Sequence, residues 1–283
     1  MREAGFLSLD GKVVKSGRPL ILPDNRSFRY GDGFFETMRM EGGEIRLQQF
    51  HMERLFASLA LLGFQAPAYF TPVYLLDRIA ELAKKNQHQG LARIRLTVYR
   101  GEGGLYDAGN HFPHHLIQTW NLDPVVNQLN ENGFEIGVFP DAKKVCDGFS
   151  HVKSNNFLAY AMAAIWVKQQ QLNEAVLLNP YGGVADATIA NIFIVKNGSV
   201  KTPALTEGPV GGVMRRYLLQ KLHNENIPVE ETRLTPEDLY QASEIFLSNA
   251  IYGIRWVKQF EGNHYGNQFA KMLYKKVYTD FAV

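Results

Sequence analysis

Residues 183–193 read Gly-Val-Ala-Asp-Ala-Thr-Ile-Ala-Asn-Ile-Phe, a polar segment that leads from a glycine turn into an apolar strand. The pattern around it predicts one strand at Glu174 to Leu178 and another at Asn191 to Lys196. Asp186 lies in the polar entry between them, where the ordinary role of an aspartate is to cap a turn. This part of the chain is therefore expected to fold as neighbouring strands.

Further strands and helices are predicted on both sides of this segment. The periodicity predicts strands at 134–139, 229–233 and 245–248, and helices at about 155–171, 212–226 and 268–278. Runs of neighbouring strands with interspersed helices are typical of the α+β class rather than of a doubly wound sheet. The fold class expected from the sequence is therefore α+β.

The first part of the chain has the pattern of a small antiparallel unit. Turn signals separate short strands that lead to Tyr30-Gly-Asp-Gly33, and Glu41-Gly-Gly-Glu44 marks a second hairpin. The segments that follow are predicted as helices at 49–63 and 71–85, a strand at 92–99, and a loop without periodicity at 101–113. A glycine- and histidine-rich loop of this kind is typically mobile or functional.

A chain of 283 residues, 46% of them hydrophobic, is long enough to divide into two domains. The best place for a connection between them is Asp123-Pro124 with the polar segment 127–132. We therefore predict a small domain over residues 1–121 and a larger domain over 122–283, which carries Lys153.

The composition excludes several classes of protein. Thirty basic residues nearly balance 28 acidic ones and lie scattered, so neither a nucleic-acid binder nor a membrane-surface protein is expected. Neither a secretion signal nor a membrane-spanning apolar run is recognisable, so a cytoplasmic protein with small-molecule ligands is expected. Cys146 is the single cysteine, which excludes an intrachain disulfide and a multi-cysteine metal site. No metal site is predicted.

Two short segments could carry chemistry. Lys153, in Ser150-His-Val-Lys-Ser-Asn-Asn156, lies between a polar loop and an apolar helical stretch. Partial burial there could lower the pKa of its amine and make it nucleophilic, although most lysines at a helix start are plain solvated cations. Gly211-Gly212 precedes a predicted helix, whose free backbone N–H groups favour an anion such as phosphate. Such glycine pairs more often serve only the turn.

Seven segments, in this order, resemble the fold type IV pyridoxal-phosphate enzymes. This group includes branched-chain aminotransferases, D-amino acid aminotransferases and 4-amino-4-deoxychorismate lyases, and the resemblance extends over nearly the whole chain. The segments are Tyr30-Gly-Asp-Gly-Phe-Phe-Glu-Thr37, His51-Met-Glu-Arg-Leu55, Lys153-Ser-Asn-Asn-Phe-Leu158, residues 183–193, Lys201-Thr-Pro203, Gly212-Val-Met-Arg215 and Leu247-Ser-Asn-Ala250.

The resemblance implies a two-domain α+β fold, with a small N-terminal α/β sandwich and a larger, β-barrel-like C-terminal domain with helices. It implies that Lys153 carries pyridoxal 5′-phosphate as a Schiff base and acts as the catalytic acid and base. It implies that Asp186 faces the pyridine nitrogen, where the family usually has a glutamate one methylene longer. A homodimer with shared active sites is implied as well.

The same resemblance implies a set of contacts to the cofactor phosphate. The guanidinium of Arg54 would bind the phosphate from one side, and the backbone N–H groups of Val213 and Met214 from the other. The backbone at Asn249 and Ala250 would complete this phosphate site.

The reaction is left open between two activities, an aminotransferase and a lyase that releases pyruvate and 4-aminobenzoate from aminodeoxychorismate for folate synthesis. The motif forms are closer to the lyases, yet the chain has no arginine from Gly101 to Met214, where such lyases use one for a substrate carboxylate. We therefore favour the aminotransferase, because it is the commonest activity on this scaffold. A cofactor-storage or regulatory module is a third, non-enzymatic alternative.

Without that loop arginine, the substrate carboxylate must be bound by other groups. The expected substrate-binding residues are Tyr30, Thr37, Arg39 and Arg95. Arg26, Arg29, Arg255, the loop histidines and backbone N–H groups are further possible sources.

Overall fold

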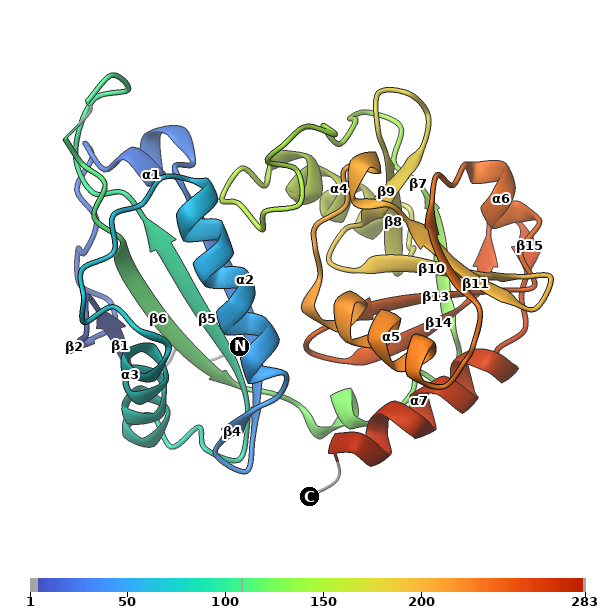
Figure 1. The fold of residues 1–283 in the computed structure, drawn as a ribbon, viewed down its shortest axis with the longest axis horizontal. Helices are drawn as coiled ribbons and strands as arrows, with labels where there is room; N and C mark the ends of the chain where they lie inside the picture. Colours follow the sequence, from blue (N-terminus) through green and yellow to red (C-terminus); the bar gives the residue numbers. More distant parts are fainter. Residues whose placement is uncertain (1–4, 108, 282–283) are drawn as a thin grey trace. The chain divides into compact units, whose positions relative to one another are not determined.

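The computed structural model describes residues 5–107 and 109–281 and divides into two compact units. Unit 1 comprises Met1–Val125 and Lys153–Asn156, and unit 2 comprises Val126–Val152 and Phe157–Val283. Figure 1 shows both units, which are described separately below. The first four residues, which entered the argument against a secretion signal, lie outside the described residues.

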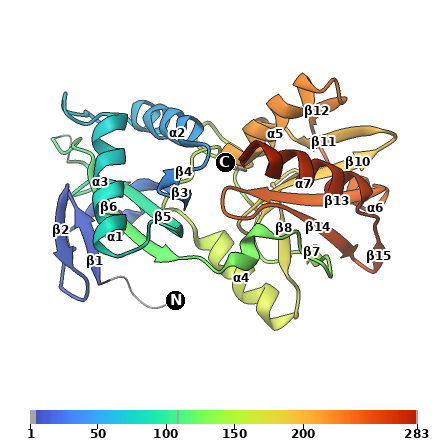
Figure 2. The ribbon, with the colours of Figure 1, turned by 90° about the horizontal axis from the view of Figure 1, so that it is seen from below.

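Unit 1 is built on a six-stranded sheet of order β2-β1-β6-β5-β3-β4, in which all neighbours are antiparallel. Its strands are β1 (Phe6–Leu9), β2 (Lys12–Lys15), β3 (Gly33–Glu41), β4 (Glu44–Ile45), β5 (Leu91–Tyr99) and β6 (His114–Asn121). Two long helices, α2 (Gln48–Leu61) and α3 (Pro72–Lys85), accompany the sheet, and the short helix α1 (Arg26–Tyr30) precedes β3 (Figures 1 and 2).

The alternation of side chains along β3 and β5 determines the two faces of this sheet. Met38, Ile94 and Leu96 are fully buried on one face, which packs against α2 and α3. Leu75 and Ile79 of α3 are fully buried as well. Thr71 begins α3 by accepting a hydrogen bond from Tyr74 N, and Pro72 follows at the first helical position.

The segment Lys153–Asn156 belongs to unit 1, whereas the sequence placed Lys153 in the second domain. Phe35 N donates to Lys153 O, and Asn155 N donates to Gly33 O, both at 2.9 Å. These bonds join the segment to β3, which is the physical reason for the difference. As a division into domains, the boundary predicted near residue 122 stays a prediction.

Unit 2 is built on a nine-stranded mixed sheet of order β12-β11-β10-β13-β14-β7-β8-β9, with β15 paired to β14. Its strands are β7 (Phe134–Val138), β8 (Glu174–Leu178), β9 (Val184–Ala187), β10 (Asn191–Lys196), β11 (Ser199–Pro203), β12 (Val229–Thr232), β13 (Glu244–Asn249), β14 (Gly253–Phe260) and β15 (Asn263–His264). An apolar core that includes Ile192, Ile194 and Val257 lies within this unit.

Four helices accompany the strands of unit 2: α4 (Leu158–Gln169), α5 (Val213–Asn224), α6 (Pro236–Tyr240) and α7 (Gln268–Phe281). Figure 2 shows α7 along β13 and β14, with which it is in contact. Two short 3₁₀ turns, η1 (Pro124–Asn127) and η2 (Leu205–Glu207), complete the regular structure of the described part of the chain. The mixture of helices and sheets, one of them curled, confirms the predicted α+β class.

Most predicted elements are confirmed to within a few residues, and β8 and β10 have the predicted bounds. The sequence predicted no strand at Gly253–Phe260, although β14 lies between β13 and β7 in the large sheet. Helix α4 begins at Leu158 rather than near Asn155. Within residues 5–107 and 109–281, no helix is long and apolar enough to cross a membrane. No cluster of metal-binding side chains occurs in those same ranges.

Candidate active site

Lys153 lies five residues before α4 rather than at its start. Its backbone is held beside β3, and an isolated bridge pairs its neighbour Ser154 with Phe34. The amine Nζ lies 4.9 Å from the centroid of the Phe35 ring. The direction of the lysine side chain in unit 1 is therefore set by pairing with a strand.

Arg54 of α2 is bound to a buried glutamate that the sequence interpretation gave no role. Its Nε and Nη2 donate to Oε1 and Oε2 of Glu36 at 2.7 and 2.5 Å. Glu36 also interacts with Nδ1 of His51 at 2.6 Å. Burial raises the pKa of Glu36, but the charge of Arg54 and the contact with His51 outweigh it and lower the pKa to about 2.

His51 is the buried companion of this pair. Burial lowers the pKa of His51, and the charges of Arg54 and Lys153 lower it further against the opposing effect of Glu36. A neutral imidazole that faces the Glu36 carboxylate through Nδ1 carries its proton on that nitrogen. Its Nε2 is buried and has no hydrogen-bond partner among the described residues.

Two of the expected substrate-binding residues lie opposite each other on the second face of the unit 1 sheet. Thr37 on β3 is the cross-strand partner of Arg95 on β5. The guanidinium carbon of Arg95 lies 3.7 Å from the centroid of the Phe35 ring, the same ring that Lys153 approaches. Burial and the charge of Arg93 lower the pKa of Arg95 to about 10, so the guanidinium is still a cation at neutral pH.

The other two expected substrate-binding residues have different surroundings. Arg39 follows Thr37 on the same strand face, is 2% exposed, and donates to Glu41 at 3.1 Å. Tyr30 is 36% exposed at the end of α1, where the guanidinium of Arg29 lies 5.2 Å from its ring centroid. Each residue is placed in unit 1, and their role towards a substrate stays a prediction.

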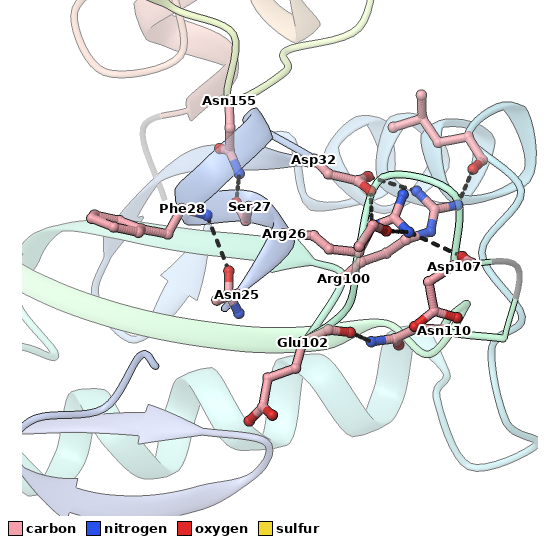
Figure 3. A network of polar contacts seen from close by, with 12 residues as sticks. Asn25, Arg26, Ser27, Phe28, Asp32, Arg100, Glu102, Asp107, Asn110 and Asn155 are labelled. Carbon is pink, nitrogen blue, oxygen red and sulfur yellow. Dashed lines mark hydrogen bonds and ion pairs between the residues drawn. The ribbon is translucent and has the colours of Figure 1, made fainter. Parts of the chain in front are cut away.

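Two alternative arginines are engaged in structural contacts. Arg26 donates to Asp32 and to the carbonyl oxygens of Gly104 and Asp107, which ties the glycine-rich loop to α1 (Figure 3). Arg100 binds the other oxygen of Asp32 at 2.6 Å. In unit 2, Arg255 donates to backbone carbonyls of its own and neighbouring segments. These contacts make Arg26 and Arg255 poor choices for a substrate carboxylate.

Figure 3 also shows how α1 is linked to the segment that carries Lys153. Nδ2 of Asn155 donates to Oγ of Ser27 at 2.9 Å. A Cβ atom on Gly33 would lie 2.6 Å from the same Nδ2 and 2.5 Å from the carbonyl oxygen of Val98. A glycine is therefore required at position 33 for this close approach.

In unit 2, Asp186 lies in β9 and is only 2% exposed, so it is not the turn cap that its sequence context suggested. The hydroxyl of Tyr160 on α4 donates to Oδ1 and Oδ2 at 3.0 Å each. Val210 N donates to Oδ2 at 2.9 Å. The Nζ of Lys144 lies 5.9 Å from the centroid of the Tyr160 ring. Burial lowers the pKa of Lys144 and outweighs the nearby charge of Asp186, which acts in the opposite direction.

The start of α5 lies close to this carboxylate within unit 2, because Val210, which donates to Asp186, shortly precedes the helix. Asn191 donates to Val210 O at 2.7 Å, so Val210 is held by Asp186 through its N–H and by Asn191 through its carbonyl. Helix α5 begins three residues later, at Val213. Among the described residues, no side chain caps its N-terminus. The first N–H groups of α5 therefore receive no side-chain cap, an arrangement that suits an anion.

The turn after β13 adjoins the same helix start. Oδ1 of Asn249 accepts hydrogen bonds from Ile251 N and Tyr252 N at 2.9 and 3.1 Å. A Cβ atom on Gly253 would lie 3.9 Å from Met214 at the start of α5. The tip of the Met214 side chain thus lies near the strand that follows this turn, and α5 is in contact with β13.

Several features of each unit fit pyridoxal phosphate as a ligand. In unit 1, Arg54 offers a guanidinium that is 15% exposed, beside the unpartnered Nε2 of His51. In unit 2, Oγ of Ser248 is buried without a hydrogen-bond partner in the described part of the chain, next to Asn249 and the uncapped helix start. Groups of this kind suit a phosphate, and the buried carboxylate of Asp186 suits a protonated ring nitrogen.

Four residues of this arrangement were missed as functional candidates. Glu36 and His51 lie within quoted motifs, but their mutual contact joins positions 15 residues apart. Tyr160 and Lys144 lie outside every motif. The one sequence feature that could have indicated Tyr160 was a tyrosine in the otherwise apolar first turns of α4. That feature did not identify Asp186 as its hydrogen-bond partner.

The chain was compared with known proteins. Residues 33–260 match the family described as amino-transferase class IV, which is well over half of the chain. The chain belongs to the class IV aminotransferase family. The cofactor of this family is pyridoxal 5′-phosphate. The resemblance inferred from the seven segments is therefore confirmed at the level of the family.

Relatives within the class IV aminotransferase family differ in their activities. The chain is 31% identical over 232 residues to an aminodeoxychorismate lyase of Vibrio harveyi, covering 81% of this chain and 83% of the relative. It is 30% identical over 276 residues to a putative branched-chain-amino-acid aminotransferase of Methanocaldococcus jannaschii, covering 96% and 94%.

A solved structure shows the same fold as this chain. The branched-chain aminotransferase of Thermoproteus uzoniensis, solved with norvaline, superposes with a TM-score of 0.84 at 25% identity. The match covers 97% of this chain and 93% of that protein. The chain is therefore a fold type IV enzyme, an aminotransferase or a lyase.

Proposed function

We propose that this class IV enzyme is an aminotransferase that moves an amino group between an amino acid and a 2-keto acid. One observation carries the proposal: the amine of Lys153 and the guanidinium of Arg95 both lie against the ring of Phe35, at 4.9 and 3.7 Å from its centroid. A reactive amine and a carboxylate-binding cation on one aromatic ring suit an amino acid.

The roles of the remaining residues follow from their chemistry. Arg54 and the N–H groups of Val213 and Met214 would bind the phosphate, together with the backbone at Asn249 and Ala250. Asp186 would hold the ring nitrogen in its protonated form. When bound, pyridoxal phosphate withdraws electrons from the α-carbon of the substrate. The amine of Lys153 would take the proton from that carbon.

The carboxylate of the amino acid is assigned to Arg95, with Thr37 opposite it. The nearby ring and the partial burial of Arg95 strengthen a charge-assisted bond there, because water competes less. Arg39 and Tyr30 are kept as further substrate-binding candidates. This assignment replaces the loop arginine that the segment from Gly101 to Met214 lacks.

A second candidate is the aminodeoxychorismate lyase activity. The 31% identity to the Vibrio harveyi lyase favours it, as do the Phe-Glu-Thr and Ser-Asn-Ala motif forms. The aminotransferase remains our first choice, because Arg95 is the arginine that shares the Phe35 ring with Lys153, and one guanidinium suits the single carboxylate of an amino acid better than the two carboxylates of the lyase substrate.

A homodimer and a cytoplasmic location complete the proposal. Helix α4 presents Leu158, Met162 and Ile165 on successive turns, and these side chains are 75%, 45% and 51% exposed. Contiguous exposed apolar groups of this kind are typical of surfaces that another protein covers. A second copy of this chain is the proposed partner.

One experiment decides between the two activities. The purified enzyme with bound pyridoxal phosphate is mixed with candidate L- and D-amino acids without any keto acid, and then with aminodeoxychorismate. An aminotransferase must stop after half a reaction with nitrogen left on the cofactor, so its visible colour fades and returns when a keto acid is added. A lyase releases pyruvate repeatedly and keeps its colour. We expect fading, and sustained pyruvate release without fading would establish the lyase instead.

A further inference from the structure

The carboxylate of Asp186 is held unusually completely by its surroundings in unit 2. At 2% exposure, this group needs protein donors in place of water. Tyr160 donates to both oxygens at 3.0 Å, and Val210 N donates to Oδ2 at 2.9 Å. Because both oxygens are bound, the carboxylate cannot turn about its last side-chain bond without losing a hydrogen bond.

The hydroxyl of Tyr160 has this single task. Among residues 5–107 and 109–281, Asp186 is the only group to which it donates. The tyrosine ring is fixed separately, because it stacks on Phe157 with 4.4 Å between centroids and packs in an apolar cluster with Phe139 and Ala163. Removal of the hydroxyl alone therefore addresses Asp186 and leaves the ring packing in place.

The electrostatic surroundings keep the phenol of Tyr160 protonated. Burial, together with the charge of Asp186 and the hydrogen bond to it, raises the pKa of Tyr160 well above its usual value, so the phenol stays a donor. A donor to the ionised carboxylate favours the charged form of Asp186. Lys144 adds a positive charge nearby, and its amine is anchored by the carbonyls of Ser150 and Gly208 at 2.9 and 2.7 Å.

We propose that Tyr160 is a positioning residue that orients the charged carboxylate of Asp186 towards the ring nitrogen of pyridoxal phosphate. An aspartate is one methylene shorter than glutamate and reaches less far, so the direction in which its carboxylate is held decides whether it can contact the ring nitrogen. The hydroxyl of Tyr160 supplies this partner. The inference rests on the proposed function, because it needs Asp186 to face the cofactor ring.

The test compares two ligands and uses binding rather than activity as its readout. Full-length wild-type protein and Tyr160→Phe, both freed of cofactor, are titrated with pyridoxal phosphate and with an analogue that has carbon in place of the ring nitrogen. We expect Tyr160→Phe to weaken binding of pyridoxal phosphate about tenfold, on the scale of one hydrogen bond to a charged group. Binding of the analogue should change less than about twofold, since it offers Asp186 no N–H.

Tyr265→Phe is the matched control, because Tyr265 is another buried tyrosine of unit 2, and its hydroxyl donates to Leu239 O at 3.1 Å. It should leave both dissociation constants unchanged. The inference is overturned if Tyr160→Phe binds pyridoxal phosphate as tightly as the wild type, or if it loses the same factor with both ligands. The second result would indicate a general structural role.

A second variant keeps the test decisive if Tyr160→Phe does not fold. Replacement of Tyr160 by 4-aminophenylalanine retains the size of the side chain and a weaker donor. The preference for pyridoxal phosphate over the analogue should then fall below that of the wild type, and an unchanged preference overturns the inference.

The proposed function is checked in the same samples. Borohydride reduction of the wild type with pyridoxal phosphate should attach the cofactor to Lys153, as read by mass spectrometry. Failure of this attachment overturns the proposed function, and the inference with it. Attachment without any change in ligand preference between the variants overturns the inference alone.

Discussion

Arg54 binds both carboxylate oxygens of Glu36, with Nε and Nη2 donating at 2.7 and 2.5 Å. This paired geometry fixes the plane of the guanidinium and leaves it 15% exposed at the surface of unit 1. The buried glutamate thus orients the arginine to which we assign the phosphate.

Arg54→Ala is expected to weaken binding of pyridoxal phosphate by about 1.5–3 kcal/mol, roughly 10- to 100-fold in the dissociation constant, because a charge-assisted contact is lost. Excess cofactor should restore much of the rate, since the reacting atoms are untouched. Titration of the cofactor-free variant measures the change. Arg78→Ala, which removes a half-exposed arginine paired with Glu81 on α3, is the control and should bind normally. Equal affinity of Arg54→Ala and the control would contradict the assignment.

Lys153→Ala is expected to abolish multiple turnover, because it removes both the amine that binds the cofactor and the group that moves the proton. Proton transfer alone typically contributes about 10²- to 10⁴-fold in rate. The cofactor should still bind through its phosphate, so turnover and affinity are measured together. Lys168→Ala, at an exposed lysine near the end of α4, should turn over like the wild type. Near-normal turnover of Lys153→Ala would reject the assignment.

Asp186→Asn is expected to retain the cofactor and to reduce kcat by roughly a hundredfold, because a neutral amide cannot stabilise a protonated ring nitrogen. The amide also places an NH₂ donor beside the hydroxyl of Tyr160, which lies 3.0 Å from both oxygens of the parent carboxylate. Steady-state kinetics at saturating cofactor measure the effect. A variant as active as the parent would move the ring partner to another residue.

The sequence predicted local elements well because their patterns are local. The apolar run of β8 and the alternation of β5 were recognised with nearly the observed bounds. Strand β14 was missed because Arg255 and Lys258 interrupt its apolar pattern. Arg255 is nevertheless only 7% exposed, since its guanidinium donates to backbone carbonyls such as those of Tyr252 and Ile254.

The contacts of the candidate site depend on pairings far apart in the chain. Lys153 was assigned to a helix start, but its carbonyl accepts from Phe35, 118 positions earlier (153 − 35). The pair of Tyr160 and Asp186 joins a helix to a strand 26 residues away. A single sequence reveals the residue types that suit a cofactor, but it does not contain the non-local pairing that orients them.

Glu174 provides a prediction about stability that is independent of the cofactor. It is 4% exposed at the start of β8, and its Oε2 has no hydrogen-bond partner within residues 5–107 and 109–281. The pKa of Glu174 is raised to about 7, chiefly by burial and to a smaller extent by the charge of Asp186. The hydrogen bonds from Thr188 and Ala175 oppose this rise. The folded chain therefore retains a proton that the unfolded chain releases near pH 4.5.

Because the folded state binds the extra proton, the free energy of unfolding should fall as the pH rises from about 4.5 to about 7, and the contribution of Glu174 should then level off. The difference in pKa corresponds to roughly 3 kcal/mol over this window. The amide of Glu174→Gln does not titrate, so the unfolding free energy of this variant should lack the decline. From pH 5 to pH 8, the wild type should therefore lose more of its unfolding free energy than Glu174→Gln does. Denaturant titrations between pH 5 and 8 measure both curves. Glu131→Gln, at an exposed position, should follow the wild type. Parallel curves for Glu174→Gln and the wild type would show that the buried carboxyl group does not retain its proton on folding.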